Sequence, residues 1–204
     1  MTRIEFAEKY LPEVIKFTSG TGLFPAFVLS QMILESSGKV DGKYIAGQSK
    51  LSREANNFFG IKASKSWTGD VYKIRTREED KNGKEFFTED NFRKYESPSA
   101  SIKDYVVFLL SNQRYSKAGI FTADTVKEQA KAIQKAGYAT DTKYAALIDS
   151  VYRQIKDTFP PSALLKPTLS DKAKALLQAA KPEAKKKIVL GWPFFYWDLL
   201  HFSF

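Results

Sequence analysis

The chain has 204 residues, enough for one well-buried core and an appendage, and its apolar and charged fractions are ordinary for a globular protein. It has no cysteine and one histidine, His201, which excludes thiol catalysis, disulfides and cysteine-ligated zinc and argues against a Ser-His-Asp triad or a multi-histidine metal site. Carboxylate acid–base chemistry is the main catalytic option left, and we expect no cofactor or metal. The net charge of +9 favours an anionic partner, either nucleic acid, a membrane surface or a polyanionic wall polymer.

Two helices are predicted at the start of the chain. Apolar periodicity indicates a first helix over 3–17, interrupted or kinked near Pro12. Pro25 suits the first turn of a second helix, and Gly38 is a plausible terminator for it.

Glu35 is the most informative residue of this second helix. It continues an apolar stripe and falls in the last turn, where both desolvation and the helix dipole disfavour a negative charge. A carboxyl group with a raised pKa is what general-acid catalysis requires. The alternative is a glutamate at the helix edge, ionised and solvated.

The middle of the chain changes its hydrophobic period. Residues 38–57 are predicted to be a loop with one short helix near 51–55. Residues 67–95 are predicted to form a small β-hairpin lobe, with a strand at 71–76 and a tight turn at Asn82-Gly83. Helices are then expected after Ser97-Pro98, over 125–135, and from a cap at Asp141 to about residue 155.

Phe159-Pro160-Pro161 marks the predicted end of the domain. We therefore expect a domain at 1–159 and a C-terminal extension at 160–204, basic first and then aromatic over 188–204. The aromatic segment is too short and too interrupted to span a bilayer, so it is expected to dock onto a partner protein, lie at a membrane interface or fold back onto the domain. No signal peptide is evident, which predicts delivery by a phage particle, a secretion assembly or lysis.

Several sequence blocks, met in order, resemble one known family. These blocks are Pro25 to Gly38 with Gln31 and Leu34-Glu35-Ser36, Asn56-Asn57-Phe58-Phe59-Gly60-Ile61-Lys62, Trp67-Thr68-Gly69, Thr76-Arg77-Glu78, Phe92-Arg93-Lys94-Tyr95, Ser101 with Asp104-Tyr105, and Gly137-Tyr138-Ala139-Thr140-Asp141 with Tyr144. From about residue 4 to 158 the chain is similar to the glucosaminidase domain of glycoside hydrolase family 73. The resemblance implies an α+β, mainly helical, lysozyme-like fold with a small β-hairpin lobe over a glycan groove. It also implies hydrolysis of the β-1,4 bond after N-acetylglucosamine in peptidoglycan, at the bacterial cell wall or in the periplasm.

The resemblance implies three catalytic residues. Glu35 matches the general acid, Glu78 a β-lobe carboxylate that positions or activates water, and Tyr138 a tyrosine near the scissile bond. Acidic residues at 79, 80 and 85 neighbour Glu78, so the sequence leaves open which of them is the second catalytic carboxylate. The structural alternative for these acids is a solvated face of the hairpin. The structural alternative for Tyr138 is simple packing. A separation of about 6.5–9.5 Å between the two carboxylates would predict inversion, whereas assistance by the substrate's acetamido group would leave Glu78 a lesser role.

Five further residues are expected to bind substrate, namely Gln31, Asn57, Phe59, Trp67 and Tyr144. Asn57 and Phe59 stand in the loop that shapes the groove, and Phe59 and Trp67 are the candidates for stacking on sugar rings.

Two alternative functions are kept beside the hydrolase. One is a lytic transglycosylase of the same fold, and the other is a non-catalytic wall-binding module of a phage tail or secretion assembly. The expected partners are peptidoglycan glycan strands, with assembly or membrane-surface contacts through 188–204. Nucleic acid is not expected, because the lysines are scattered and no recognition element stands out.

Overall fold

Helices make up most of the computed structural model, which describes the backbone of residues 1–79 and 85–180 and all side chains there except those of 76–79 and 85–88. The α-helices are α1 (Arg3–Thr18), α2 (Pro25–Ser36), α3 (Lys50–Ala55), α4 (Pro98–Ser111), α5 (Gln113–Lys117), α6 (Val126–Lys135), α7 (Tyr144–Ile155), α8 (Pro161–Leu164) and α9 (Asp171–Ala179). The strands form two separate antiparallel pairs, β1 (Gly38–Val40) with β2 (Lys43–Ile45) and β3 (Val71–Glu79) with β4 (Glu85–Arg93). A mainly helical α+β fold is therefore confirmed.

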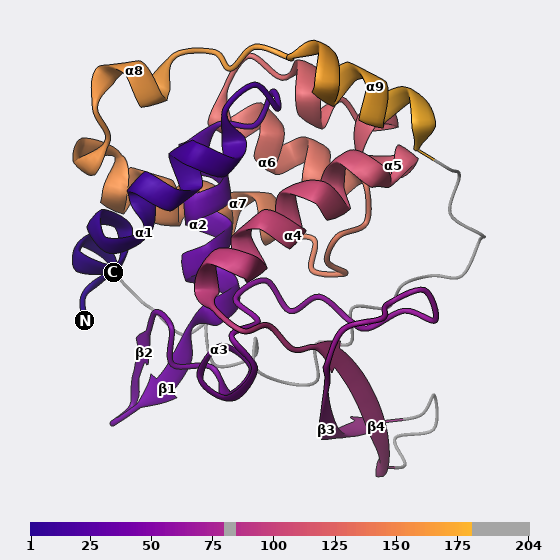
Figure 1. Cartoon of the computed structure of the whole chain (residues 1–204). Helices are drawn as coiled ribbons and strands as arrows, with labels where there is room; N and C mark the ends of the chain where they lie inside the picture. The colour runs from indigo at the N-terminus through magenta and orange to yellow at the C-terminus, as the bar shows by residue number, and fades with distance from the viewer. Residues whose placement is uncertain (80–84, 181–204) are drawn as a thin grey trace.

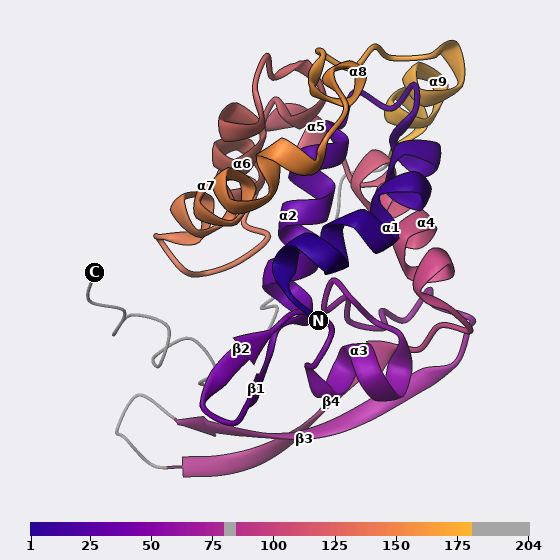
Figure 2. The ribbon, with the colours of Figure 1, turned by 90° about the vertical axis from the view of Figure 1, so that its left-hand side faces the viewer.

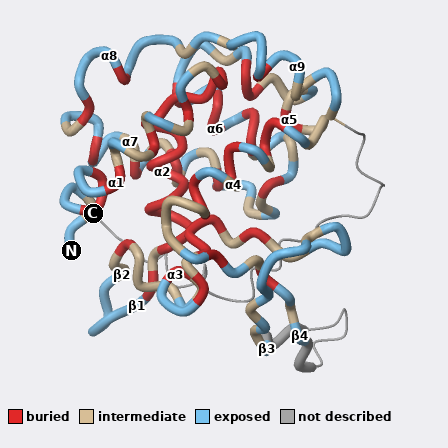
Figure 3. The backbone as a smooth tube through the Cα atoms, viewed as in Figure 1, coloured by how far each residue is buried: buried red, intermediate tan, exposed pale blue. Residues whose placement is uncertain are grey.

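Helix α2 is the centre of the helical body. All twelve of its residues are buried, including the polar ones, and it contacts α1, α6, α7 and α8. Figure 3 shows it as a continuous buried segment surrounded by helices whose outer sides are exposed. A helix that is apolar on every side must lie inside the core. Proline is tolerated in the first turn of this helix, because N–H groups there have no partner within the helix.

The surrounding helices begin where local chemistry allows. Thr2 and Glu5 form a capping box at the start of α1, and the Ser97 hydroxyl accepts from Ala100 N (3.1 Å) at the start of α4. Pro12 lies inside α1, which continues to Thr18. Asp141 does not cap α7 directly, because its carboxylate accepts from Lys143 N (2.7 Å), one residue before the helix.

The first hairpin, β1–β2, was missed, because residues 38–57 are predicted above to be loop with one short helix. Asp41 and Gly42 both have positive φ, as a tight two-residue turn requires, so the Asp-Gly pair was the available signal. The prediction that Gly38 ends α2 is also wrong. The helix ends at Ser36, and Gly38 lies in β1, where a Cβ atom would stand 2.2 Å from Gln48 O. Close backbone approach explains this glycine.

The second hairpin, β3–β4, forms the expected β-lobe and projects from the helical body (Figures 1 and 2). Its base is tied to the loop that follows α3, since Ala63 N donates to Asn91 O (2.8 Å) and Arg93 N donates to Ile61 O (3.0 Å). The predicted turn at Asn82-Gly83 lies outside the described residues.

The folded body does not end at Phe159. Residues 168–170 pair with the turn after α1, through Gly22 N to Thr168 O (3.2 Å) and Ser170 N to Gly20 O (2.8 Å). Ala163 of α8 and Ala173 of α9 belong to the buried core, and Figure 1 shows both helices lying along the helical body. Residues 160–179 are thus part of the domain, and the segment 188–204, for which docking was predicted, lies outside the described residues.

Within the described ranges, no helix has the length and apolar character needed to cross a membrane.

This placement of α9 predicts that Ala173→Asp destabilises the domain by about 2–4 kcal/mol, since a carboxylate would be buried without a partner. Ala175→Asp is the matched control, because Ala175 is exposed on the same helix. Chemical denaturation of the full chain measures both. Equal stability of the two variants would show that α9 does not belong to the core.

Candidate active site

Glu35 lies in the last turn of α2 and is 5% exposed. Burial raises the pKa of its carboxyl group from 4.5 to about 8, and a hydrogen bond from Tyr144 acts in the opposite direction. The prediction of a buried, protonated glutamate is therefore confirmed, and the solvated alternative is wrong. At neutral pH this group is an acid with a proton to give.

A line of buried hydrogen bonds leads to one oxygen of Glu35. The Tyr144 hydroxyl donates to Glu35 Oε1, Gln31 Nε2 donates to the Tyr144 hydroxyl (2.7 Å), and the Tyr105 hydroxyl donates to Gln31 Oε1. The three supporting residues come from α7, α2 and α4, and each is at most 1% exposed. Tertiary packing brings together groups that are more than 70 positions apart in the sequence.

The other oxygen, Glu35 Oε2, is buried and has no hydrogen-bond partner among the described residues. Gly60 lies beside it with φ +65°, and a Cβ atom at this position would stand 3.8 Å from Oε2. Glycine suits both the left-handed backbone and the space in front of the acid. The two oxygens of Glu35 are therefore inequivalent, because Tyr144 donates to one and the other has no hydrogen-bond partner among the described residues.

The loop after α3 carries Gly60, and Asn57 holds this loop in shape. The Asn57 amide donates to Ile61 O (2.9 Å) and Arg93 O (2.8 Å), while its oxygen accepts from Ile61 N (3.1 Å). These bonds use the polar atoms of the side chain, which is 1% exposed. Asn57 thus fixes the loop to the base of the β-lobe, and its part in shaping a substrate groove stays a prediction.

Three residues expected at the substrate lie behind the acid instead. Gln31 and Tyr144 are buried and bond Glu35 and each other, so they are not placed to bind a sugar. Phe59 is fully buried and stacks on Tyr105, with ring centroids 4.0 Å apart, which leaves it no free face for a pyranose ring. The sugar-stacking interpretation of Phe59 is therefore wrong, because its ring is buried in the core.

Tyr138 is also buried. Its hydroxyl donates to Phe59 O (2.7 Å), and its ring is parallel to that of Tyr144 at 6.0 Å. Burial and the nearby Glu35 charge raise the pKa of Tyr138 well above its usual value, so it acts here as a neutral donor. A direct catalytic role for Tyr138 stays a prediction.

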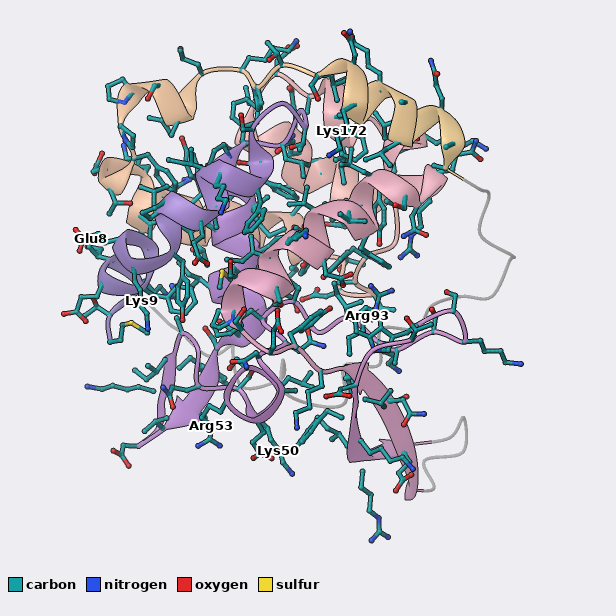
Figure 4. All side chains as sticks on the ribbon, viewed as in Figure 1. Glu8, Lys9, Lys50, Arg53, Arg93 and Lys172 are labelled. Carbon is teal, nitrogen blue, oxygen red and sulfur yellow. The ribbon has the colours of Figure 1, made fainter. Side chains whose placement is uncertain are left out.

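Trp67 lies at the junction of the β-lobe and the helical body and is partly exposed. The Arg93 guanidinium covers its ring at 4.6 Å, and Arg93 also pairs with Asp104 of α4 (2.7 Å). Figure 4 shows Arg93 at this junction, between the hairpin and α4. Trp67 retains an exposed edge, and its role in sugar binding stays a prediction.

The structure places Glu78 in β3, opposite Phe86 in the hairpin register. The side chain lies outside the described part, so its role as the second carboxylate stays a prediction.

Two residues of the site were not singled out by the sequence. Tyr105 and Gly60 appear above only as members of the family-like sequence blocks, without a role in the site. A tyrosine hydroxyl on a buried helix face needs a hydrogen-bond partner, so the signal for Tyr105 was its polar atom at a core position.

Comparisons with known proteins agree with this architecture. The model for glucosaminidases, described as mannosyl-glycoprotein endo-beta-N-acetylglucosaminidase, matches residues 11–157. The glycoside hydrolase domain of FlgJ from Salmonella typhimurium, in a C-terminally truncated form, superimposes with a TM-score of 0.57 at 31% identity, over 76% of this chain and 98% of that one. The catalytic domain of the autolysin Auto from Listeria monocytogenes shares the fold, with a TM-score of 0.62 at 24% identity, over 76% and 84% of the two chains. The fold is that of the lysozyme-like glucosaminidases.

The curated relatives point to the same family. Peptidoglycan hydrolase FlgJ of Salmonella typhimurium is 39% identical over 133 residues, which are 63% of this chain and 39% of that protein. Exo-glucosaminidase LytG of Bacillus subtilis is 32% identical over 132 residues, or 63% and 43% of the two chains. This chain thus spans about two fifths of the length of these relatives. It belongs to the glucosaminidase family, glycoside hydrolase family 73.

The raised pKa of Glu35 predicts how stability depends on pH. The folded-state value, about 8, lies above the ordinary value of 4.5, so the stability from the neutral carboxyl is fully present below pH 4.5 and is lost as the pH rises to 8. At roughly 1.4 kcal/mol per pH unit, the loss amounts to several kcal/mol. Glu35→Gln removes this dependence.

Thermal denaturation at pH 5 and pH 8 tests this pH dependence of stability. We expect the melting temperature of Glu35→Gln, relative to that of the wild type, to be higher at pH 8 than at pH 5. A constant difference between the two proteins across this range would contradict a buried, neutral Glu35.

Proposed function

We propose that this chain is a peptidoglycan hydrolase that cleaves the β-1,4 bond after N-acetylglucosamine in cell-wall glycan strands, with Glu35 as the general acid. The observation that carries the proposal is the state of Glu35, which is buried, neutral near pH 7 and bonded at one oxygen only. Membership of the glucosaminidase family supports the substrate class, as does similarity to peptidoglycan hydrolase FlgJ and exo-glucosaminidase LytG.

The chemistry begins with a proton transfer. The O–H bond at Glu35 breaks, its proton goes to the glycosidic oxygen, and the bond from that oxygen to the sugar carbon breaks with its electron pair leaving on the oxygen. The carboxylate that is produced keeps the hydrogen bond from Tyr144, which stabilises the new charge in a buried site. Tyr144 therefore favours the product of the transfer, while burial keeps the acid protonated beforehand.

The fate of the oxocarbenium-like sugar depends on a second group. In our proposal Glu78, on the β-lobe, serves as the base for water, and the substrate's own acetamido group is the alternative nucleophile. The lobe is attached to the loop that holds Gly60 through the Asn57 and Arg93 contacts. Position and orientation of this lobe relative to Glu35 thus depend on Asn57.

The proposed place of action is the bacterial cell wall or the periplasm, where the glycan strands are. The high net positive charge supports attraction to an anionic wall. Delivery by a phage particle, a secretion assembly or lysis stays a prediction, as does contact with a protein assembly or a membrane surface through residues 188–204.

Digestion of purified peptidoglycan tests the reaction. We expect the wild type to release fragments with new reducing ends on N-acetylglucosamine, identified by mass spectrometry. Glu35→Gln should lose about 10²- to 10⁴-fold in rate because the proton donor is gone. Glu8→Gln is the matched control, since Glu8 is exposed on the outer side of α1 (Figure 4), and it should retain wild-type activity.

Each other outcome points to a different class. Anhydro-muramic ends would assign the chain to the lytic transglycosylases. Absence of products from folded wild-type protein would favour the non-catalytic wall-binding module.

The pH profile of kcat/KM is a separate prediction. A general acid is active only while protonated, so the rate should fall as the pH rises through about 8, the pKa given to Glu35 by burial. Soluble glycan fragments assayed between pH 5 and pH 10 provide the measurement. An alkaline limb near pH 5 would mean that Glu35 is ionised at neutral pH and would contradict its role as the acid.

A further inference from the structure

The hydrogen bonds behind Glu35 have a direction as well as a geometry. A tyrosine hydroxyl has one proton to donate, and an amide has distinct donor and acceptor ends. Tyr105 donates to Gln31 Oε1, so the amide presents its NH₂ group to Tyr144. The Tyr144 oxygen is then an acceptor, and its single proton is directed to Glu35 Oε1.

From this direction we infer that Tyr105 and Gln31 are positioning residues that determine which oxygen of Glu35 carries the proton for transfer. With Tyr144 donating to Oε1, that oxygen must act as the carbonyl acceptor. The acid proton is thereby assigned to Oε2, the oxygen that lies beside Gly60 and has no partner among the described residues. This inference rests on the proposed role of Glu35 as the general acid.

The opposite direction would place the proton elsewhere. If the Gln31 amide were reversed, Tyr144 would donate to Gln31 Oε1, and the neutral Glu35 would donate from Oε1 to the Tyr144 hydroxyl. The acid proton would then be held in the core, on the far side of the carboxyl group from Gly60. The reversed amide would also leave the Tyr105 hydroxyl proton without an acceptor in a fully buried place, which is costly. Tyr105 therefore selects the productive direction.

The ionisable groups around Glu35 are compatible with this arrangement. Tyr144 comes from α7, Tyr138 from the segment before α7 and Tyr105 from α4, and burial raises the pKa of each well above its usual value, with the charge of Glu35 contributing. All three tyrosines are neutral hydrogen-bond donors over the pH range of the assays. The loop after α3 contributes Gly60. The proton on Glu35 is thus the one that titrates in this cluster near neutral pH.

The test compares Tyr105→Phe and Gln31→Leu with the wild type. Without the Tyr105 hydroxyl, the Gln31 amide can reverse and accept from Tyr144, so the neutral Glu35 gains an acceptor for its proton at Oε1. The protonated form is favoured, and the proton is held away from the substrate. We expect kcat to fall about 3- to 10-fold, the range of one buried hydrogen bond, with KM unchanged and the alkaline limb of the rate profile moved to higher pH. Gln31→Leu cannot accept from Tyr144, so the Tyr144 hydroxyl keeps donating to Glu35 Oε1 and the alkaline limb of this variant should not move to higher pH.

Tyr10→Phe is the control, because it also removes a hydroxyl from a buried tyrosine, in the α1 aromatic cluster with Phe6 and Phe58. It should leave both kcat and the alkaline limb unchanged. A fall in kcat in Tyr105→Phe without movement of the limb would indicate a packing role and overturn the inference. An unchanged rate in Tyr105→Phe, or a limb moved equally to higher pH in Gln31→Leu, would overturn it too.

A second readout does not need activity. In protein labelled with ¹³C at the glutamate carboxyl carbons, the Glu35 resonance is the one that disappears in Glu35→Gln, and its titration reports the protonation of the group directly. Tyr105→Phe should move that titration to higher pH and Tyr10→Phe should not. If the wild type hydrolyses no peptidoglycan, the proposed function fails, whereas the titration still decides whether Tyr105 controls the proton on Glu35.

Discussion

The burial of one carboxyl group is the constraint on which the rest of this site depends. Glu35 lies in the last turn of a helix whose every residue is inside the core, and an ionised carboxylate there would be strongly disfavoured. The fold avoids this cost at neutral pH because the raised pKa keeps the group protonated, with one hydrogen bond from Tyr144. As a consequence, the stability of the fold declines as the pH rises. The same burial makes Glu35 the proton donor in the proposed reaction.

The surrounding fold holds the two oxygens of this group in different environments. Helices α2, α4 and α7 contribute Gln31, Tyr105 and Tyr144 on the core side. The loop after α3 contributes Gly60 on the other side, and Asn57 connects that loop to the β-lobe through the carbonyl oxygen of Arg93. The helical body therefore holds Glu35 from one side, and the loop with Gly60 lies beside its other oxygen.

Much of the fold could be predicted because its signals are local. Helices with apolar periodicity and a cap or proline at the start, such as those beginning at Pro25 and Pro98, were located within one or two residues. The predictions failed where tertiary contacts decide the outcome. Gly38 ends no helix and is instead explained by the approach of the Gln48 backbone. Residues 160–179, which begin with two prolines, join the core through contacts with the turn after α1, which lies far away in the sequence.

The sequence by itself determined that a glutamate would lie on an apolar helix, that carboxylate chemistry was the main catalytic option, and that the ordered motifs resemble the glucosaminidase family. These conclusions follow from residue types and their spacing along one chain. Only the tertiary structure decided how Glu35 is held, because Tyr144 bonds it from α7 and Tyr105 bonds Gln31 from α4. These tyrosines lie 113 and 74 positions from the Gln31 amide that links them. The direction of a buried hydrogen bond depends on which donor and acceptor face each other in space, and spacing along the sequence does not contain that information.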